Sequence, residues 1–188
     1  MKLFGLLGAA LVAAPLVAAA AQSAPQPAPA PGGTVADRLI NDPRADALQP
    51  YGQRIPPETR ADKGVQFGKA LRVPISSVLK EFGLVGAITP TLKPVKQGDR
   101  IVVALWARAQ RTEAGVPGAL CRVQLEATPV VRTIFEQSFD VTPEWQMFKL
   151  SGTADRAYPA GGLNAAVHLA CAKQTIDLGP VFILDYGQ

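Results

Sequence analysis

Apolar and polar residues alternate with a period of two in several segments between residues 100 and 186. The pattern is clearest in residues 119–126, and residues 163–171 also follow it. A period of two places successive side chains on opposite faces of an extended strand. No long segment of the same region keeps the 3.6-residue period of an amphipathic helix. The pattern therefore predicts an all-β fold.

Eight strands are expected, at residues 66–74, 87–94, 100–110, 119–126, 131–141, 145–152, 163–171 and 175–186. Residues 100–110 are apolar on both faces, which is typical of a central strand covered on both sides. Residues 87–94 contain prolines, which favours an edge position. Pro180 predicts a bend or bulge in the last strand. Short strands joined by loops indicate a two-sheet β-sandwich or jelly roll, with a β-barrel as the competing architecture.

The first 24 residues resemble a secretory signal peptide. Lys2 precedes an apolar run that ends in small residues, and cleavage is expected after Ala21 or Ala24. The run is close to the lower length limit for a bilayer span, so an uncleaved anchor is the alternative. After cleavage we expect no stable membrane span, and a periplasmic or extracellular protein.

Residues 25–64 are expected to form a Pro/Ala-rich linker followed by an extended lead-in, and residues 65–188 the β-sandwich domain. Prolines interrupt the lead-in, which contains one candidate short helix at residues 35–40. The lead-in either lies against the domain or stays loose.

The formal net charge of +4 comes from scattered residues. There is neither a basic helix nor a run of Lys and Arg, so no nucleic-acid partner is expected. A single histidine and two distant cysteines do not suit zinc. Asp177 and Asp185 are candidates for a structural calcium site, but no dense Asp/Asn loop accompanies them, and no metal or cofactor is predicted.

Two cysteines in an exported chain favour a disulfide between Cys121 and Cys171. Two buried free thiols are the alternative. Their separation excludes a Cys-x-x-Cys redox motif.

Four strings occur in order along the domain: GKALRV, KQGDRIVVALWARA, FDVTPEWQMFKLSG and QTIDLGPVFILDYG. Their order and spacing resemble the CenC-like carbohydrate-binding modules, which are galactose-binding-like jelly rolls. The resemblance covers roughly residues 65–187. It implies that strands 119–126 and 163–171 are antiparallel neighbours. Such pairing would bring Cys121 and Cys171 within bridging range, both with inward-facing side chains by the alternation.

The resemblance also implies a non-catalytic module that binds a polysaccharide or oligosaccharide on the concave face of one sheet. That sheet would contain strands 87–94, 119–126, 131–141 and 163–171. The expected ligand-binding side chains on its outer face are Arg122, Gln124, Arg132, Glu136, Asn164 and His168. Glu126 and Ile134 share this face, which has two arginines suited to an acidic sugar. It has no Trp or Tyr, and Phe82 is the only ring in the connection where relatives often carry an aromatic residue.

Two other functions remain open. One is a structural or protein-interaction domain of the cell envelope that binds no sugar. The other is a small hydrolase that uses His168, with Ser138 as the nearest nucleophile, but no Gly-x-Ser-x-Gly elbow is present. A surface histidine without catalytic function is the simpler interpretation, and Trp106 and Trp145 are expected to serve the core or scaffold.

Overall fold

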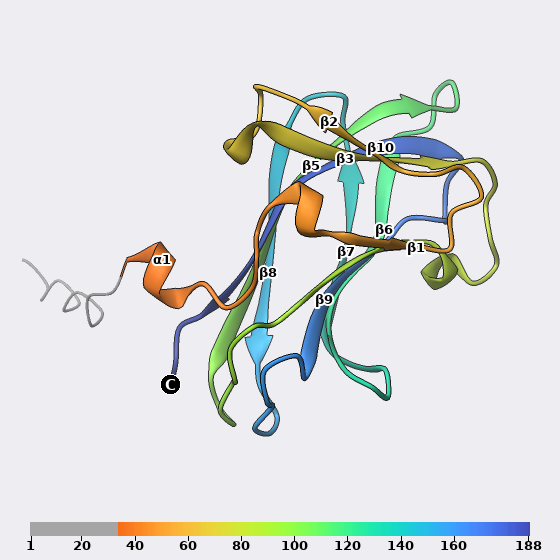
Figure 1. Ribbon diagram of the computed structural model, residues 1–188. Helices are drawn as coiled ribbons and strands as arrows, with labels where there is room; N and C mark the ends of the chain where they lie inside the picture. The colour runs from red at the N-terminus through yellow and green to blue at the C-terminus, as the bar shows by residue number, and fades with distance from the viewer. Residues whose placement is uncertain (1–33) are drawn as a thin grey trace, which may run out of the picture. The chain divides into compact units, whose positions relative to one another are not determined.

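Two antiparallel five-stranded sheets make up the protein in the computed structural model, which describes residues 34–188 (Figure 1). The strands are β1 (Gln49–Tyr51), β2 (Glu58–Ala61), β3 (Lys69–Ile75), β4 (Gly86–Pro90), β5 (Arg100–Thr112), β6 (Gly118–Ala127), β7 (Arg132–Val141), β8 (Gln146–Thr153), β9 (Leu163–His168) and β10 (Gln174–Asp185). The helical turns are α1 (Val35–Arg38), η1 (Ala45–Ala47), η2 (Gln66–Gly68) and η3 (Phe82–Leu84).

Sheet 1 has the strand order β1-β4-β9-β6-β7, and sheet 2 has the order β2-β3-β10-β5-β8. The predicted all-β sandwich is therefore confirmed, and the eight expected strands correspond to β3 through β10. The predicted signal peptide and the Pro/Ala-rich linker up to residue 33 lie outside the described residues. No helix within residues 34–188 is long and apolar enough to cross a bilayer.

The core lies between the sheets and is filled mostly by the inward-facing side chains that the alternation predicts. Its largest members, all less than 2% exposed, include Ile101, Leu105, Leu125, Leu163, Leu169, Ile176, Leu178 and Ile183. Leu120 also lies in the core, although the alternation of residues 119–126 places it on the opposite face from Leu125. Burying such side chains is the main favourable contribution to folding. The period-two pattern therefore indicates the inward face of a strand wherever its register is regular.

The lead-in contributes a strand to each sheet. β1 pairs with β4 at the edge of sheet 1, and β2 pairs with β3 at the edge of sheet 2. The expectation that the second predicted strand lies at an edge is therefore wrong, because β1 covers the open side of β4. Pro94 falls outside β4 and Pro90 is its last residue, so neither proline interrupts the ladder.

The lead-in also continues sheet 2 where β3 ends. β10 pairs with β3 only from Gln174 to Leu178, and its register with β5 shifts between Leu178 and Val181, around Pro180 as expected. Beyond this shift the lead-in takes the place of β3. The Ile40 amide donates to the Ile183 carbonyl at 2.9 Å, and the Val181 amide donates to the Pro43 carbonyl at 2.9 Å. The sandwich thus includes residues assigned to the lead-in.

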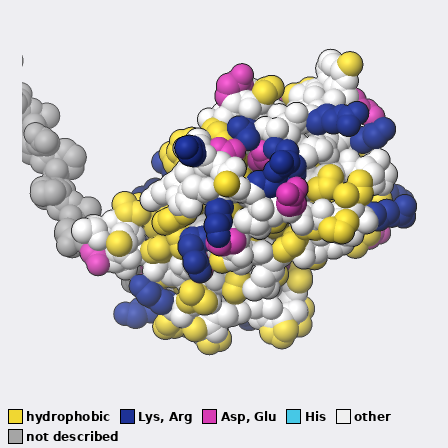
Figure 2. All heavy atoms as spheres, turned by 45° about the horizontal axis from the view of Figure 1, so that its top comes forward, with side chains coloured by type: hydrophobic (Ala, Val, Ile, Leu, Met, Phe, Trp, Pro, Cys, Tyr) yellow, Lys and Arg dark blue, Asp and Glu magenta, His cyan; other side chains and the backbone are white. Residues whose placement is uncertain are grey.

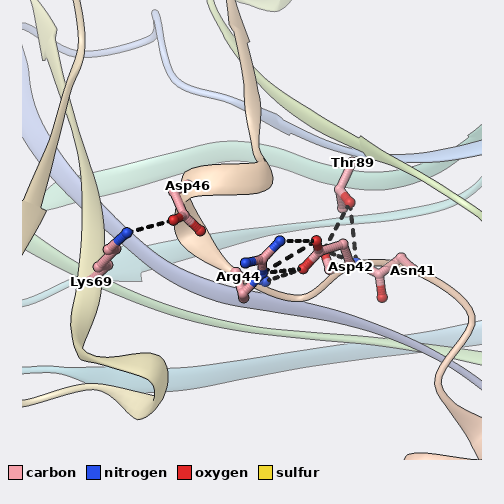
Figure 3. A network of polar contacts seen from close by, with 6 residues as sticks. All are labelled: Asn41, Asp42, Arg44, Asp46, Lys69 and Thr89. Carbon is pink, nitrogen blue, oxygen red and sulfur yellow. Dashed lines mark hydrogen bonds and ion pairs between the residues drawn. The ribbon is translucent and has the colours of Figure 1, made fainter.

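Asn41 connects the lead-in to both sheets. Figure 3 shows its contact with Thr89 of β4 in sheet 1. Its side-chain amide donates to the Val181 carbonyl at 2.8 Å and to the Thr89 hydroxyl of β4 at 3.1 Å, and its carbonyl accepts from the Ile183 amide at 2.7 Å. Asn41 is 5% exposed. A buried amide that satisfies backbone groups on another strand fixes the position of its segment.

The predicted disulfide between Cys121 and Cys171 is present, with a Cα–Cα distance of 5.7 Å. The antiparallel pairing of β6 with β9 is confirmed as well. The inward orientation of Cys171 is wrong: β9 ends at His168, the chain turns outward, and Cys171 is exposed. At the other end of the bridge, the register of β6 on β7 shifts between Leu120 and Val123, so simple alternation fails at Cys121.

We expect replacement of both cysteines by serine to lower the free energy of unfolding by about 4 kcal/mol, because the bridge closes a loop of 50 residues in the unfolded chain. Urea unfolding of the Cys121→Ser/Cys171→Ser protein measures the loss. Reductant should destabilise the unmodified protein equally and leave the double variant unchanged. An unchanged urea midpoint in the variant would contradict the prediction.

We expect Asn41→Ala to lower the free energy of unfolding by about 3 kcal/mol, because the amide of Ile183 and the carbonyl of Val181 lose a buried partner. Arg44→Ala is the matched control, since Arg44 pairs with Asp42 on the same segment with a side chain that is 56% exposed. Its effect should stay within about 1 kcal/mol. Equal, small losses in both variants would mean that the lead-in does not stabilise the sandwich.

Candidate functional site

The outer face of sheet 1 consists of cross-strand rows fixed by the strand register. One row crosses β1, β4, β9 and β6 as Tyr51, Gly86, His168 and Arg122. The next row runs Gln49, Ile88, Ala166, Gln124 and Glu136 and includes β7. The third row runs Pro90, Asn164, Glu126 and Thr133. Gly86 and Ala166 are small residues in the middle of this face, so larger side chains around them enclose a hollow.

A groove of about 420 Å³ lies on this face. The strand residues that line it are Gln49, Pro50, Tyr51, Ile88, Glu126, Asn164 and His168. Gly83 of η3 and Val131, just before β7, complete the lining. Its volume is within the range of ordinary ligand pockets. The sheet thus offers a site that combines apolar surfaces with a few polar groups.

Tyr51 reaches across β4 to His168. Its hydroxyl shares a hydrogen bond of 2.8 Å with His168 Nδ1. Glycine is needed at position 86 for this contact, because a Cβ there would lie 2.6 Å from the Tyr51 hydroxyl oxygen. Burial, and secondly the negative charge of Glu126, raise the pKa of Tyr51 well above its usual value, so the phenol stays protonated.

His168 is enclosed. The Phe82 ring meets the imidazole edge-on at 6.4 Å between centroids, and a Cβ on Gly83 would come within 3.5 Å of Nδ1. The residue is 8% exposed, so the interpretation of His168 as a surface histidine is wrong. Burial, and secondly the positive charge of Arg122, lower the pKa of His168, while a backbone hydrogen bond with Gly83 and the charge of Glu136 act in the opposite direction. A neutral imidazole therefore forms one wall of the groove.

A buried carboxylate lies at the other end of the groove. Glu126 is 6% exposed and accepts a hydrogen bond from the Gln124 side-chain amide. The Gln124 carbonyl in turn accepts from the Thr133 hydroxyl at 3.1 Å. This chain of hydrogen bonds orients Glu126 and leaves Gln124, which is 3% exposed, below the surface of the groove.

The structure brings only some of the expected ligand-binding residues together. Asn164 and His168 line the groove, and Gln124 supports Glu126 from beneath. Arg122 and Glu136 form an ion pair with each other at 3.1 Å, and the Arg122 guanidinium lies 5.1 Å from the centroid of the Phe82 ring. Neither of the pair lines the groove.

Arg132 lies elsewhere, because the register of β7 on β6 shifts between Leu125 and Glu126. The shift pairs Arg132 with core-facing Ala127. Its guanidinium donates to Asp155 at 2.8 Å and to the Tyr158 hydroxyl at 2.6 Å. Arg132 therefore does not line the groove, although its side chain is 44% exposed.

Sequence reasoning missed the residues of β1. Tyr51 supplies the aromatic ring that the predicted face lacked, and Gln49 adds an amide beside it. β1 has three residues and includes Pro50, so no alternation could reveal it. The one available signal was the position of Gly86 at the start of a strand, where glycine often permits a close approach by another group.

Other candidate residues lie outside this groove. Trp106 belongs to β5, and Trp145 immediately precedes β8. Both strands are in sheet 2. Asp177, considered for calcium, is held by Arg72 and Arg108 at 2.7 Å and 3.0 Å. Within residues 34–188, no three or more His, Cys, Asp or Glu side chains gather closely enough to hold a metal ion. Ser138 donates its hydroxyl proton to the Cys121 carbonyl at 2.7 Å.

Three solved structures with a similar arrangement of strands are carbohydrate-binding domains. A CBM4 domain aligns with a TM-score of 0.55 and 17% identity over 74% of this chain and 95% of that chain. The N-terminal cellulose-binding domain of Cellulomonas fimi β-1,4-glucanase C aligns with a TM-score of 0.55 and 19% identity, over 77% of this chain and 91% of that chain. The CBM22-1 xylan-binding domain of Paenibacillus barcinonensis Xyn10C aligns with a TM-score of 0.56 and 11% identity, over 80% of this chain and 95% of that chain.

The chain has the fold of these carbohydrate-binding modules. The resemblance found in the sequence strings is thus supported by the structure as a whole. No protein-family model and no curated protein sequence matches the chain. At these identities the likeness concerns the fold alone.

The buried His168 predicts a pH dependence of stability. Its lowered pKa means that the folded state binds a proton less readily than the unfolded chain, whose histidine titrates near 6.5. The contribution of His168 to the free energy of unfolding should therefore be fully present above that pH and should decrease as the pH drops below it. His168→Gln should flatten this slope, as measured by urea unfolding between about pH 5 and pH 7.5. An identical slope in both proteins would contradict the prediction.

Proposed function

We propose that this protein is an exported, non-catalytic carbohydrate-binding module whose groove on sheet 1 binds a glycan chain. The single observation that carries the proposal is the groove itself, which crosses four strands of a sheet in a fold used by carbohydrate-binding domains. A groove that crosses a sheet and is open at the surface suits an extended chain.

The lining suits sugar rings. Tyr51, Ile88 and Val131 offer apolar surface for the C–H faces of a pyranose or furanose ring. Gln49, Asn164 and Glu126 offer amide and carboxylate groups for hydroxyls. Few, well-oriented polar groups among apolar ones are typical of small-molecule sites.

The charge of the lining favours a neutral glycan. Glu126 lies in the groove, and the described lining residues include no Lys or Arg. An acidic sugar in this groove would meet a carboxylate without a compensating cation. The two arginines that suggested an acidic sugar are paired with Glu136 and Asp155 instead.

A binding function without catalysis is consistent with the chemistry of this face. His168 is buried against Tyr51, and Ser138 is engaged with a backbone carbonyl. Export is supported by the apolar N-terminal run and by the disulfide, since disulfides persist in oxidising compartments. The proposal therefore places the protein in the periplasm or outside the cell.

Titration with neutral oligosaccharides of glucan and xylan type tests the proposal. We expect saturable binding that Asn164→Ala weakens about tenfold, the effect of one lost hydrogen bond with partial loss of packing. Arg132→Ala is the matched control and should bind like the unmodified protein, because Arg132 lies away from the groove. Isothermal titration calorimetry measures both affinities.

Absence of saturable binding to every neutral glycan would overturn the proposal. It would favour the alternative of a protein-interaction domain of the cell envelope. Equal losses in Asn164→Ala and Arg132→Ala would show that the binding site is not the groove.

A further inference from the structure

A second recess lies at one end of sheet 2. It consists of two adjoining hollows of about 650 Å³ and 400 Å³. The residues that line both hollows are Ile55, Pro74, Arg111 and Thr175. None of the residues lining either hollow lines the groove on sheet 1. The recess is therefore a separate candidate site with its own central residues.

The strand register explains why three of these residues lie together. Thr175 of β10 pairs with Pro74 of β3 on one side and with Arg111 of β5 on the other. The three residues thus form one row across the sheet. Ile55, in the connection between β1 and β2, is 47% exposed and adds an apolar wall. A guanidinium, a hydroxyl and two apolar surfaces meet at the junction of the hollows.

In the neighbouring row, which contains Arg72, Asp177 and Arg108, the charged side chains pair with one another. Asp177, which is 2% exposed, accepts two hydrogen bonds from Arg72 and two from Arg108. Arg108 also donates to Asp62 at 2.7 Å. Figure 2 shows Lys and Arg side chains together with acidic ones on the face that comes forward from the top of Figure 1. These arginines are therefore engaged within the protein.

Arg111 differs from them. Among residues 34–188, no side chain or carbonyl forms a hydrogen bond or ion pair with its guanidinium. The other charged residues of the recess have partners of opposite charge. In the larger hollow Lys173 and Glu113 lie 3.9 Å apart. In the smaller hollow Glu58 lies 3.9 Å from Arg60, and Arg72 is paired with Asp177 at 2.7 Å. The positive charge left without a described partner at the centre of the recess is that of Arg111.

The chemistry of this row indicates the ligand. A guanidinium binds a carboxylate with two parallel hydrogen bonds, a geometry that a lysine does not offer. The Thr175 hydroxyl can donate to or accept from a sugar hydroxyl. Pro74 and Ile55 provide apolar surface for a ring face. Each hollow has a volume in the range of ordinary ligand pockets.

We propose that this recess is a second binding site, in which Arg111 binds the carboxylate of a uronic-acid residue in an acidic polysaccharide. The site is independent of the groove on sheet 1, whose lining carries Glu126 and suits neutral chains. One module would then hold two chemically different glycans on separate surfaces.

Calorimetric titration of the full chain with an oligomer of galacturonate tests this proposal, with a galactose oligomer of the same length as the neutral counterpart. We expect saturable binding of the galacturonate oligomer that Arg111→Ala weakens at least about tenfold. Arg111→Lys should restore part of the affinity, since it keeps the charge but loses the paired geometry. Lys149→Ala, which removes an exposed cation of β8, should change the affinity by less than about twofold.

Three results would overturn the proposal: no saturable binding of the galacturonate oligomer, equal losses in Arg111→Ala and Lys149→Ala, or equally tight binding of polyglutamate, which would indicate an acidic peptide site. Asn164→Ala distinguishes this site from the groove on sheet 1. It should lower the affinity for neutral glycans and leave the affinity for the galacturonate oligomer unchanged. Arg111 is exposed, so Arg111→Ala should keep the urea midpoint of the unmodified protein and remain a valid test.

Discussion

The attachment of residues 39–51 to the sandwich is the constraint on which the rest of the structure depends. Asn41 joins this segment to β10 and to β4 through buried hydrogen bonds, and the backbone of Ile40 and Pro43 continues sheet 2 where β3 ends. These bonds fix the path of the chain into β1. Without that path, β4 would be an open edge and the groove would lack Tyr51.

The hydrogen bond between Tyr51 and His168 connects the attached segment to the candidate site, because both residues line the groove. It spans the width of β4, and the absence of a side chain at Gly86 makes room for it. The pair closes one side of the groove, while Gln124 and Thr133 hold Glu126 at the other. A face whose polar groups are held by their own neighbours is prepared to bind a ligand without further ordering.

The sequence predicts what regular alternation can encode. The strands β5, β6 and β9 and most of their core-facing side chains follow from the period of two. The pairing of β6 with β9 follows instead from the resemblance to the carbohydrate-binding modules. The pairing of Cys121 with Cys171 follows once strands 119–126 and 163–171 are placed side by side. These features depend on many residues acting together, so single exceptions do not obscure them.

What the sequence does not predict depends on short or irregular elements. β1 is three residues long and includes a proline, so Tyr51 gives no strand signal. The register shift in β7 turns Arg132 away from the face that alternation assigned to it. His168 has the parity of a surface residue, but Tyr51, Phe82 and Gly83 pack around its ring and bury it. Two of the six expected ligand-binding residues, Asn164 and His168, line the groove.

The central claim is that the lead-in and sheet 1 together form the glycan-binding surface. Because the chain has a single histidine, the imidazole resonances of His168 report on this surface directly. During titration with a neutral oligosaccharide, NMR should show saturable shifts of the His168 ring and of the Asn164 side-chain amide. Saturable binding that leaves both groups unshifted would contradict the claim.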